Sequence, residues 1–388
     1  MARGGGKPSP HHISPDIALG SADIQRSLRF NRADSAHLTY TPASASSDRT
    51  KITISVWVKK CGINEGEYSI FHGGTTSNDR SQLRFYHSGG YDNLSFFARV
   101  SGTFILQCDT SAKFRDPSSW YHIVARCDTT NGTANIYVNG EDQDLSTSTK
   151  PSGSQSLTFF NNVEHQIGER GYDGSGTYIN GYMAEMNVIQ GQALDPSYFG
   201  FTDTQTGIWM PKRYEGTYGD GFYLDFLDNT STTTLGIDKS PNGNDFTLNN
   251  FSVAAGEDND SLLDTPSNNF CTMNPLMMNG TEIAGTHSDG NLTWKSDNNY
   301  ATTQATFPVT TGKWYWECEM ESQYVSIAGI TRGTNAAENT YIGYDTNGNL
   351  FGFGYYYNDG TVKGTTDGLG TTSNNNLATS QTLSLIHI

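Results

Sequence analysis

Short runs in which hydrophobic and polar residues alternate recur along the first part of the chain. A strand places successive side chains on opposite faces, so a two-residue period predicts strands with one buried face. Turn residues separate the runs, and no stretch shows the 3.6-residue period of a helix. The runs predicted as strands are 27–30, 37–40, 51–60, 68–74, 81–87, 94–100, 103–109, 120–128 and 134–141.

Two of these runs carry additional information. In 51–60, Val56 and Val58 alternate with Trp57, so both faces carry bulky side chains, as is typical of a central strand. In 134–141, Asn139 and Gly140 favour a two-residue hairpin turn, because both central positions of that turn need a positive φ. Many short strands separated by such turns predict a β-sandwich or a β-barrel.

The composition fits an all-β protein and narrows the range of its partners. Charged residues make up 16% of the 388 residues, where about 25% is usual, and Gly, Asn, Ser and Thr take their place. Aromatic residues reach 12%, which argues against a disordered chain. The net charge of −16 repels phosphate groups, so we expect no nucleic acid partner.

The sequence shows neither a membrane span nor a secretory leader. No stretch approaches about 18 consecutive apolar residues, so we expect no membrane insertion. Residues 1–24 are predicted to form a flexible lead, and no apolar run follows Arg3 and Lys7 as a Sec signal requires. If the protein acts outside a cell, it leaves by another route.

The order of motifs in residues 25–205 resembles that of laminin-G-like domains. The runs 120–124 and 136–140 resemble the paired strands of that family, and 179–186 resembles a later strand. The resemblance implies a concanavalin A-like jelly roll for residues 25–205. At Ala184 and Glu185 the family often has two acidic residues, and this departure weakens a polar or metal-binding role for the segment.

The remainder of the chain resembles parts of two other groups of proteins. Residues 206–278, rich in Gly, Asn and Thr, resemble the connector of marine bacteriophage structural and tail proteins. Residues 279–388 resemble the opening strands of a SPRY domain, on the segments 312–319, 341–344 and 351–355. The SPRY pattern is not completed, and the ending 384–388 resembles translated adapter sequence, with a short C-terminal strand as the alternative. The expected fold class is therefore all-β: a laminin-G-like jelly-roll sandwich, a connector and an incomplete second β-sandwich.

Two Gly-rich loops of the expected jelly roll carry residues that suit a sugar ligand. An aromatic ring offers a flat surface to the apolar face of a sugar, while Asp, Asn and Arg bond its hydroxyl groups. Binding residues favour loops on a rigid scaffold. Ordinary exposed tyrosines are the alternative. The candidate binding residues are Tyr91 and Asp92 in one loop, and Arg170, Tyr172 and Asp173 in the other.

A polar loop around Gly243 alternates side chains that carry oxygen. Calcium takes six to eight oxygen ligands, so the loop is a candidate calcium site, and no other cofactor is expected. It is not an EF-hand, because its twelfth position is Asn249 rather than Glu. An Asn-Gly turn stabilised by its own side chains is the alternative. The candidate ligands are Asp238, Asn242, Asn244 and Asp245.

Signatures of the common hydrolases are absent, since the sequence contains neither GxSxG nor HExxH. Glu317, Glu319 and Glu321 share one face of a predicted strand, with neighbours roughly 6.5–7 Å apart. A retaining glycosidase needs two carboxyl groups about 5–5.5 Å apart. However, the E-x-D-x-x-E pattern of jelly-roll glycosidases is missing, and a solvated outer face is the alternative. We expect no enzymatic activity.

Taken together, the resemblances imply a non-enzymatic component of a phage virion, tail-associated, whose jelly roll binds host surface carbohydrate or protein. Other virion proteins are expected partners, and an oligomer is compatible with the sequence, although no heptad repeat predicts one. The expected location is the virion or the extracellular space, without an N-terminal Sec signal. Two alternatives remain: a jelly-roll glycoside hydrolase or depolymerase acting through Glu317 and Glu319, and a purely structural virion protein.

Overall fold

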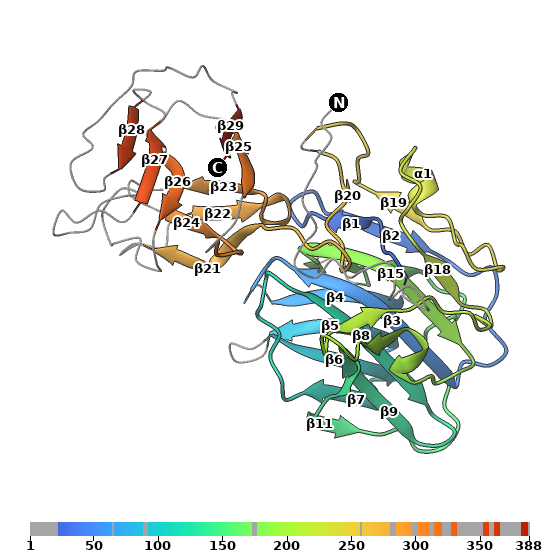
Figure 1. Cartoon of the computed structure of the whole chain (residues 1–388). Helices are drawn as coiled ribbons and strands as arrows, with labels where there is room; N and C mark the ends of the chain where they lie inside the picture. Colours follow the sequence, from blue (N-terminus) through green and yellow to red (C-terminus); the bar gives the residue numbers. More distant parts are fainter. Residues whose placement is uncertain are drawn as a thin grey trace. The chain divides into compact units, whose positions relative to one another are not determined.

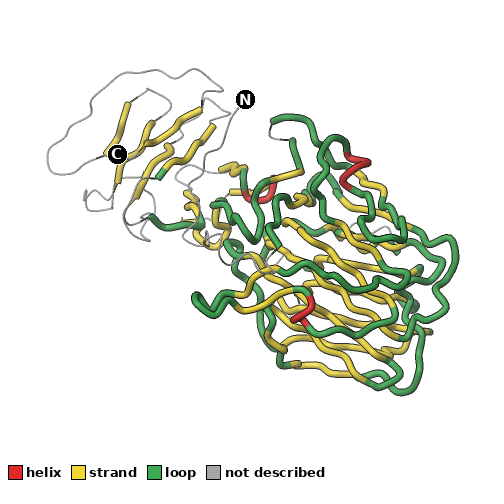
Figure 2. Tube along the Cα trace, turned by 45° about the vertical axis from the view of Figure 1, so that its right-hand side comes forward, coloured by secondary structure: helices red, strands yellow, loops and turns green. Residues whose placement is uncertain are grey.

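Strands dominate both compact units into which the chain divides (Figures 1 and 2). Among the described residues, the larger unit contains 22–270 with 288–290, and the smaller unit contains those from 271 onward except 288–290. The computed structural model describes residues 22–63, 66–87, 92–172, 177–256, 258–279, 285–296, 302–309, 314–319, 327–331, 352–356, 361–364 and 382–386.

The larger unit contains two antiparallel sheets of eight strands each. In spatial order, the first sheet consists of β10 (Glu141–Asp142), β9 (Thr133–Val138), β8 (Trp120–Asp128), β3 (Lys51–Lys60), β15 (Gly181–Gln190), β1 (Ser27–Phe30) and β20 (Ser261–Leu262), with β18 (Phe222–Leu224) also paired to β15. The second sheet consists of β11 (Leu145–Thr149), β7 (Thr103–Thr110), β6 (Asp92–Val100), β5 (Arg80–His87), β4 (Glu67–Gly74), β12 (His165–Ile167), β2 (His37–Tyr40) and β19 (Thr247–Asn249).

Shorter elements connect these strands. Two hairpins stand apart from the large sheets, β13 (Glu169–Arg170) with β14 (Thr177–Tyr178), and β16 (Gly200–Thr202) with β17 (Trp209–Pro211). The helical segments are α1 (Thr232–Leu235), η2 (Pro196–Tyr198) and η3 (Asp289–Asn291). No helix in the part of the chain that the structure describes is long and apolar enough to cross a membrane.

The inner faces of the two sheets form the main hydrophobic core. Val56 and Val58 of the first sheet belong to the same buried cluster as Leu83 and Phe96 of the second. The two-residue alternation seen in the sequence therefore separates a core-facing side from an outer side on most strands. Trp57 lies on the opposite face of β3, in a separate cluster outside the sandwich interior. This confirms that 51–60 is a central strand, since β3 pairs with both β8 and β15.

The turn predicted at Asn139 and Gly140 is also confirmed. Val138 pairs with Glu141, which leaves Asn139 and Gly140 as the two central residues of the hairpin between β9 and β10. Their φ angles are 50° and 82°, so both occupy the left-handed region. A side chain on Gly140 would also clash with the ring of Trp209, which adds a steric reason for glycine there.

Residues 206–270, which resemble a connector in sequence, complete both sheets of the larger unit. β18 pairs with β15 and β20 pairs with β1 in the first sheet, while β19 pairs with β2 in the second. Phe222, Leu224 and Phe246 from this segment are buried in the main core. The compact unit therefore extends to Phe270 rather than ending near residue 205.

The smaller unit contains several short sheets. β25 (Tyr315–Glu319) alternates exposed and partly buried residues, and its whole length pairs with β29 (Thr382–Ile386), so residues 382–386 form a strand. The pairs are β21 (Met273–Asn279) with β24 (Thr302–Ala305), β22 (Gly285–Ser288) with β23 (Thr293–Ser296), and β25 (Tyr315–Glu319) with β29 (Thr382–Ile386). A three-stranded sheet contains β26 (Ile327–Thr331), β27 (Gly352–Tyr356) and β28 (Thr361–Gly364).

Candidate functional site

The outer face of the second sheet gathers charged and aromatic side chains on its central strands β4, β5 and β6, which lie side by side (Figure 1). On β5, Leu83 and Phe85 point into the core, so alternation turns Arg80, Gln82, Arg84 and Tyr86 outward. On β4, a register shift after Ser69 places His72 opposite the outward-facing Gln82. We define the arginine face as Arg80, Arg84 and Arg170 together with Glu67, His72, Gln82, Tyr86, Phe97 and Tyr172.

Guanidinium groups lie over aromatic rings across the arginine face. The central carbon of the Arg80 guanidinium is 5.0 Å from the ring centroid of Phe97 and 4.4 Å from that of Tyr172. The Arg84 guanidinium is 4.6 Å from Phe97 and 4.2 Å from Tyr86. Contacts of this kind contribute about 0.5–2 kcal/mol each. They hold the planar guanidinium groups in fixed positions against the rings.

Glu67 supplies the negative charge of the arginine face. Its Oε2 lies 2.9 Å from Nη1 of Arg84 and 2.6 Å from Nη1 of Arg170, and its Oε1 accepts a hydrogen bond from Gln82 at 2.7 Å. Burial alone would raise the pKa of Glu67, but the two arginines and the hydrogen bonds hold that pKa below its ordinary value. Glu67 is therefore a fixed carboxylate rather than a proton donor.

Arg80 differs from the other two arginines of the face. Its side chain is buried, with 7% of the residue exposed, and it makes no ion pair with a carboxylate of the described residues. Within the described part of the chain, its Nε and Nη1 atoms have no hydrogen-bond acceptor. Burial lowers the pKa of Arg80, although a guanidinium stays charged in proteins. A buried charge without a counter-ion costs several kcal/mol, more than the cation–π contacts are expected to return.

His72, Gln82 and Ser95 provide uncharged polar groups beside Arg80. Within the described part of the chain, both ring nitrogens of His72, Oε1 of Gln82 and Oγ of Ser95 are buried without a hydrogen bond of ordinary geometry. Burial, and then the nearby Arg80, lower the pKa of His72 to about 3, so its ring is neutral above that pH. The face thus combines charged donors with neutral groups that suit hydroxyl partners.

The structure divides the predicted sugar-binding residues. Arg170 and Tyr172 belong to the arginine face, where Tyr172 covers Arg80 and its ring lies 5.8 Å from that of His72. Asp92, in contrast, begins β6 on its core-facing side and forms a fully buried ion pair with Lys60. The expected exposed loop position of Asp92 is therefore not observed, because the charge of Lys60 holds its carboxylate in the interior.

The predicted sugar-binding residues Tyr91 and Asp173 lie outside the described residues.

The carboxylate oxygen atoms of the candidate calcium loop accept hydrogen bonds from the loop itself and from Tyr223. Oδ1 of Asp238 accepts from the backbone N–H groups of Tyr223 and Ser240, both at 2.8 Å. Oδ2 accepts from Oγ of Ser240 at 2.8 Å and from the N–H of Asn244 at 2.9 Å. Asp245 accepts from the N–H of Asp238 at 2.9 Å.

The two asparagines of this loop are used in the same way. Nδ2 of Asn242 donates to the carbonyl of Gly219 at 2.7 Å, and Nδ2 of Asn244 donates to that of Gly221 at 2.9 Å. Oδ1 of Asn244 accepts from the hydroxyl of Tyr40. Among the described residues of the whole chain, no cluster of three or more His, Cys, Asp or Glu side chains has metal-binding geometry. The arrangement is that of a turn stabilised by its own side chains.

We expect a calcium chelator to leave the thermal unfolding temperature unchanged, because four hydrogen bonds already satisfy the Asp238 carboxylate. An Asp238→Ala variant should lose about 1–3 kcal/mol of stability with or without chelator. Differential scanning fluorimetry with EDTA, and then with added Ca²⁺ or Mg²⁺, makes the measurement. A fall in Tm that Ca²⁺ alone reverses would contradict this prediction, since a ligand at 100 times its Kd contributes about 2.7 kcal/mol.

The carboxylates proposed for the hydrolase alternative lie on β25 of the smaller unit. Glu317 and Glu319 are both exposed, while Trp316 and Cys318 between them are partly buried, as the alternation predicts. The hydroxyl of Tyr315 donates to Oε1 of Glu317. Glu321 lies outside the described residues.

A buried serine–histidine pair lies on the outer face of the first sheet, and no motif in the sequence indicated it. Oγ of Ser55 is 2.9 Å from Nε2 of His122, and Nε1 of Trp209 donates to Nδ1 of His122 at 2.9 Å. Because Nδ1 accepts, Nε2 carries the proton and donates to Ser55, so His122 cannot remove the serine proton. Burial lowers the pKa of His122 to about 3. The pair lines a cavity of only about 10 Å³, about the volume that one water molecule needs.

Glu185 lines the same small cavity and sits at a bulge in β15. The register of β15 against β3 shifts between Ala184 and Asn187, and Glu185 has a φ of 49°. Its Oε2 accepts a hydrogen bond from the hydroxyl of Tyr223 at 2.7 Å. Desolvation raises the pKa of Glu185 to about 7, so this carboxyl group holds a proton at mildly acid pH.

In a larger cavity, of about 410 Å³, the polar groups of the lining form hydrogen bonds and ion pairs with neighbouring protein groups. Arg29 pairs with Asp260 through an Nε–Oδ1 distance of 2.9 Å, and Oδ2 of Asp260 accepts from the N–H of Ser252 at 2.8 Å. Nδ2 of Asn31 donates to both Asp34 and Asp289, at 2.7 and 3.0 Å. Its polar groups therefore bind one another, unlike those around Arg80.

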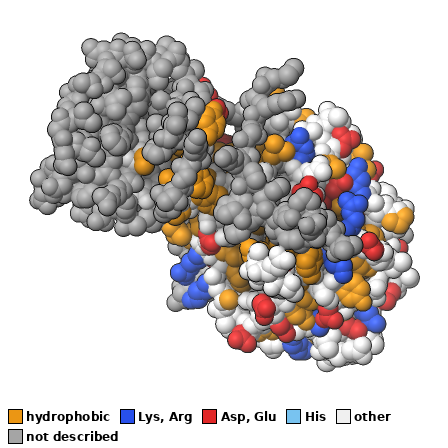
Figure 3. Space-filling view, in the orientation of Figure 1, with side chains coloured by type: hydrophobic (Ala, Val, Ile, Leu, Met, Phe, Trp, Pro, Cys, Tyr) orange, Lys and Arg blue, Asp and Glu red, His pale blue; other side chains and the backbone are white. Residues whose placement is uncertain are grey.

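On the face drawn in Figure 3, charge is dispersed over the described residues. In the view of Figure 3, Lys and Arg side chains of the described residues are scattered among Asp and Glu, without a broad area of one sign. The concentration of arginine around Phe97 is a local feature in a chain whose net charge is −16.

Residues 32–197 match the family model described as the concanavalin A-like lectin/glucanases superfamily. The match and the paired antiparallel sheets establish a concanavalin A-like, laminin-G-type jelly-roll sandwich, as the sequence predicted. No curated protein matches the chain.

Several solved structures are similar to this chain. A Bacteroides ovatus protein, provisionally assigned to carbohydrate binding, is 16% identical over 59% of this chain and 59% of its own, with a TM-score of 0.39. The chain thus spans less than two thirds of that protein. A bacteriophage CBA120 tailspike domain is 15% identical over 45% of this chain and 26% of its own, with a TM-score of 0.35. A Limulus polyphemus pentraxin is 17% identical over 45% and 80%, with a TM-score of 0.32.

Proposed function

We propose that this chain is a carbohydrate-binding protein and that it binds its ligand on the arginine face. The observation that carries the proposal is the combination of ring faces and hydrogen-bonding groups on the central strands of one sheet. Tyr86 and Tyr172 offer flat apolar surfaces, and beside them Oε1 of Gln82 is buried without a hydrogen-bond donor among the described residues. Binding sites typically combine apolar and aromatic area with a few placed polar groups.

We further propose that the protein binds sugar without cleaving it. Glycoside hydrolysis generally uses two carboxyl groups, one of which must hold a proton at working pH. Among the described residues, the arginine face has one carboxyl group, Glu67, and the charges of Arg84 and Arg170 keep it ionised. The exposed Glu317 and Glu319 belong to the smaller unit. These features favour binding over catalysis.

We also propose, more specifically, that the chain is a component of a phage virion and that its ligand is a glycan of the host surface. This proposal rests on the resemblance of residues 206–278 to the connector of marine bacteriophage structural and tail proteins, together with the predicted order of the modules and the acidity of the chain. Mass spectrometry of purified particles that encode this chain would test it, and absence of the chain from intact particles would contradict it.

Replacing Tyr86 with alanine is expected to weaken glycan binding by about tenfold or more, because a well-placed aromatic anchor contributes more than about 1.4 kcal/mol. Tyr86 is 37% exposed, so the substitution should leave the fold intact. The full-length chain is screened on a glycan array, and the affinity for each bound glycan is then measured by calorimetry.

Two further variants control the Tyr86 experiment. Tyr86→Phe keeps the ring and should retain most of the affinity. Tyr198→Ala removes an exposed tyrosine of η2, which is not part of the arginine face, and should bind as the native protein does. Equal affinities for Tyr86→Ala and Tyr198→Ala would contradict binding at the arginine face.

A further inference from the structure

Arg80 is a buried cation whose counter-ion is not supplied by the described residues. Its guanidinium group lies between the rings of Phe97 and Tyr172, and its Nε and Nη1 atoms have no acceptor within the described part of the chain. Elsewhere in the larger unit, buried cations are paired: Lys59 with Asp264, and Lys60 with Asp92. Arg80, which has no such carboxylate partner among the described residues, lies on the face proposed to bind ligand.

Among the described residues of the arginine face, positive groups gather around Arg80. Arg80, Arg84 and Arg170 carry three positive charges, and Glu67, already bonded to Arg84 and Arg170, carries one negative charge. Nε of Arg84 also has no acceptor within the described part of the chain. His72 is neutral and adds no charge. An anion placed against Arg80 would therefore meet a guanidinium group that has no carboxylate partner among the described residues, in a poorly hydrated setting where the attraction is strong.

We propose that the arginine face selects an anionic sugar, one that carries a carboxylate or a sulfate group. This inference rests on the proposed carbohydrate-binding function and names its ligand class. The anionic group accepts charge-assisted hydrogen bonds from the N–H groups of Arg80 and Arg84. The rings of Tyr86 and Tyr172 contact the apolar face of the sugar, and His72 and Gln82 bond its hydroxyl groups. A neutral sugar would leave the charge of Arg80 buried and unpaired.

The test uses a glycan array on which each acidic oligosaccharide is paired with its neutral counterpart, carboxyl-reduced or desulfated. The full-length native chain is expected to bind acidic members at least about tenfold more tightly than their counterparts. The carboxylated and sulfated pairs distinguish the two sources of negative charge. Equal binding within pairs would overturn the anionic preference and leave the carbohydrate-binding function standing. Absence of binding to every glycan would contradict both.

An Arg80→Met variant assigns the preference to this residue. Its affinity for the bound acidic glycan should fall by about tenfold to a hundredfold, while its affinity for the neutral counterpart stays within about twofold. Arg126→Met is the matched control, because Arg126, on β8 of the first sheet, also lies over a tyrosine ring, at 5.2 Å from Tyr137, but pairs with Asp195. If both variants keep the native preference, Arg80 is not the anion-binding residue.

A salt titration of the native chain gives an answer even if Arg80→Met fails to fold. The screening length falls to about 3 Å at 1 M ionic strength, so affinity for the acidic glycan should decrease as NaCl is raised. Affinity for the neutral counterpart should stay nearly constant. Parallel curves for the two glycans would overturn the proposal.

Discussion

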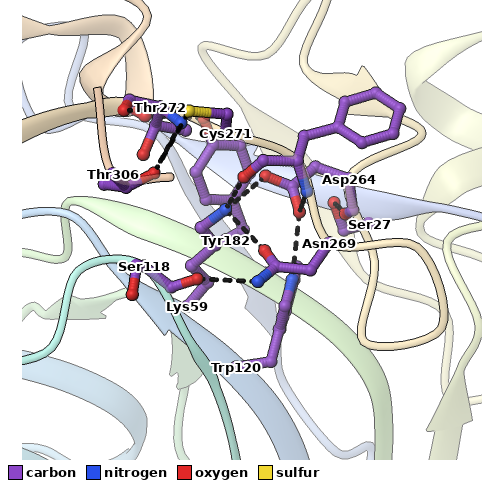
Figure 4. A network of polar contacts seen from close by, with 12 residues as sticks. Ser27, Lys59, Ser118, Trp120, Tyr182, Asp264, Asn269, Cys271, Thr272 and Thr306 are labelled. Carbon is purple, nitrogen blue, oxygen red and sulfur yellow. Dashed lines mark hydrogen bonds and ion pairs between the residues drawn. The ribbon is translucent and has the colours of Figure 1, made fainter. Parts of the chain in front are cut away.

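Replacing Asp264 with alanine is expected to lower the free energy of unfolding of the larger unit by about 3–5 kcal/mol. Asp264 is the counter-ion of Lys59, whose side chain is fully buried on β3, and Nζ of Lys59 lies 2.7 Å from Oδ2 of Asp264 (Figure 4). The alanine variant leaves the ammonium group buried without a carboxylate, and removing one partner of a buried pair is the costly case.

Further hydrogen bonds make this site more sensitive than an isolated ion pair. Nζ of Lys59 also donates to Oδ1 of Asn269 at 2.8 Å and to the carbonyl of Phe270 at 2.7 Å. Oδ1 of Asp264 accepts from Nε1 of Trp120 at 3.0 Å. The network attaches residues 264–270 to β3 and β8 (Figure 4). Loss of the carboxylate therefore also leaves the buried indole N–H without its acceptor.

Urea unfolding of the native chain and the variant, followed by tryptophan fluorescence, measures the difference. Asp195→Ala is the matched control, because Asp195 pairs with Arg126 and is 60% exposed, and such pairs contribute about 0–1 kcal/mol. A double variant, Lys59→Met with Asp264→Leu, should cost less than the sum of the two single changes. A cost for Asp264→Ala as small as that for Asp195→Ala would contradict a buried, coupled network.

The strands of the sandwich could be predicted because a two-residue period is visible within each strand alone. Four predicted runs have the bounds of the observed strands: Ser27–Phe30, His37–Tyr40, Lys51–Lys60 and Trp120–Asp128. Strands β4 to β7 differ from their predicted runs by one or two residues at one end, and the run 134–141 contains most of β9, a turn and the start of β10. Between residues 206 and 270 the strands have two or three residues, too few to show a period. Their place in the sheets depends on pairing with β1, β2 and β15, and the sequence of residues 206–270 alone does not show that pairing.

The site was harder to predict because its charges are paired across long sequence separations. Arg170 and Tyr172 stood out in a Gly-rich loop, where functional residues are commonly sought. Arg80 and Arg84 alternate with core residues of β5, and this pattern is also that of an ordinary solvated face. What distinguishes these two arginines from an ordinary solvated face is that too few carboxylates of the described residues lie beside them. Only the folded sheet shows this. Asp92 was predicted to be an exposed loop residue, but it is buried because it pairs with Lys60, which is 32 residues away in the sequence.

Three buried histidines make the larger unit sensitive to acid. Burial is the main reason that the pKa values of His72, His122 and His165 fall from 6.5 to about 3, 3 and 4. Below about pH 6.5 the unfolded chain takes up a proton on each of them, while the folded chain does not. Their contribution to stability is therefore present above that pH and is lost as the pH falls toward their folded pKa values.

Glu185 acts in the opposite direction. Its pKa rises from 4.5 to about 7 on folding, chiefly by desolvation, so the folded chain holds a proton that the unfolded chain has released. This contribution is present below about pH 4.5 and is lost as the pH rises to 7. Between about pH 6 and 5, unfolding thus takes up about three protons on histidines and releases about one from Glu185, a net uptake of about two.

A net uptake of two protons corresponds to a loss of about 2.7 kcal/mol of stability for each unit of pH, and we expect this slope between pH 6 and 5. Urea unfolding at closely spaced pH values measures it. His72→Gln should reduce the slope to about 1.4 kcal/mol per unit, whereas Glu185→Gln should increase it to about 4.1, because the opposing proton is removed. Since the two variants shift the slope in opposite directions, a general effect of acid on the surface cannot imitate the result. Stability that stays constant or increases from pH 6 to pH 5 would show that these four groups do not titrate as their burial implies.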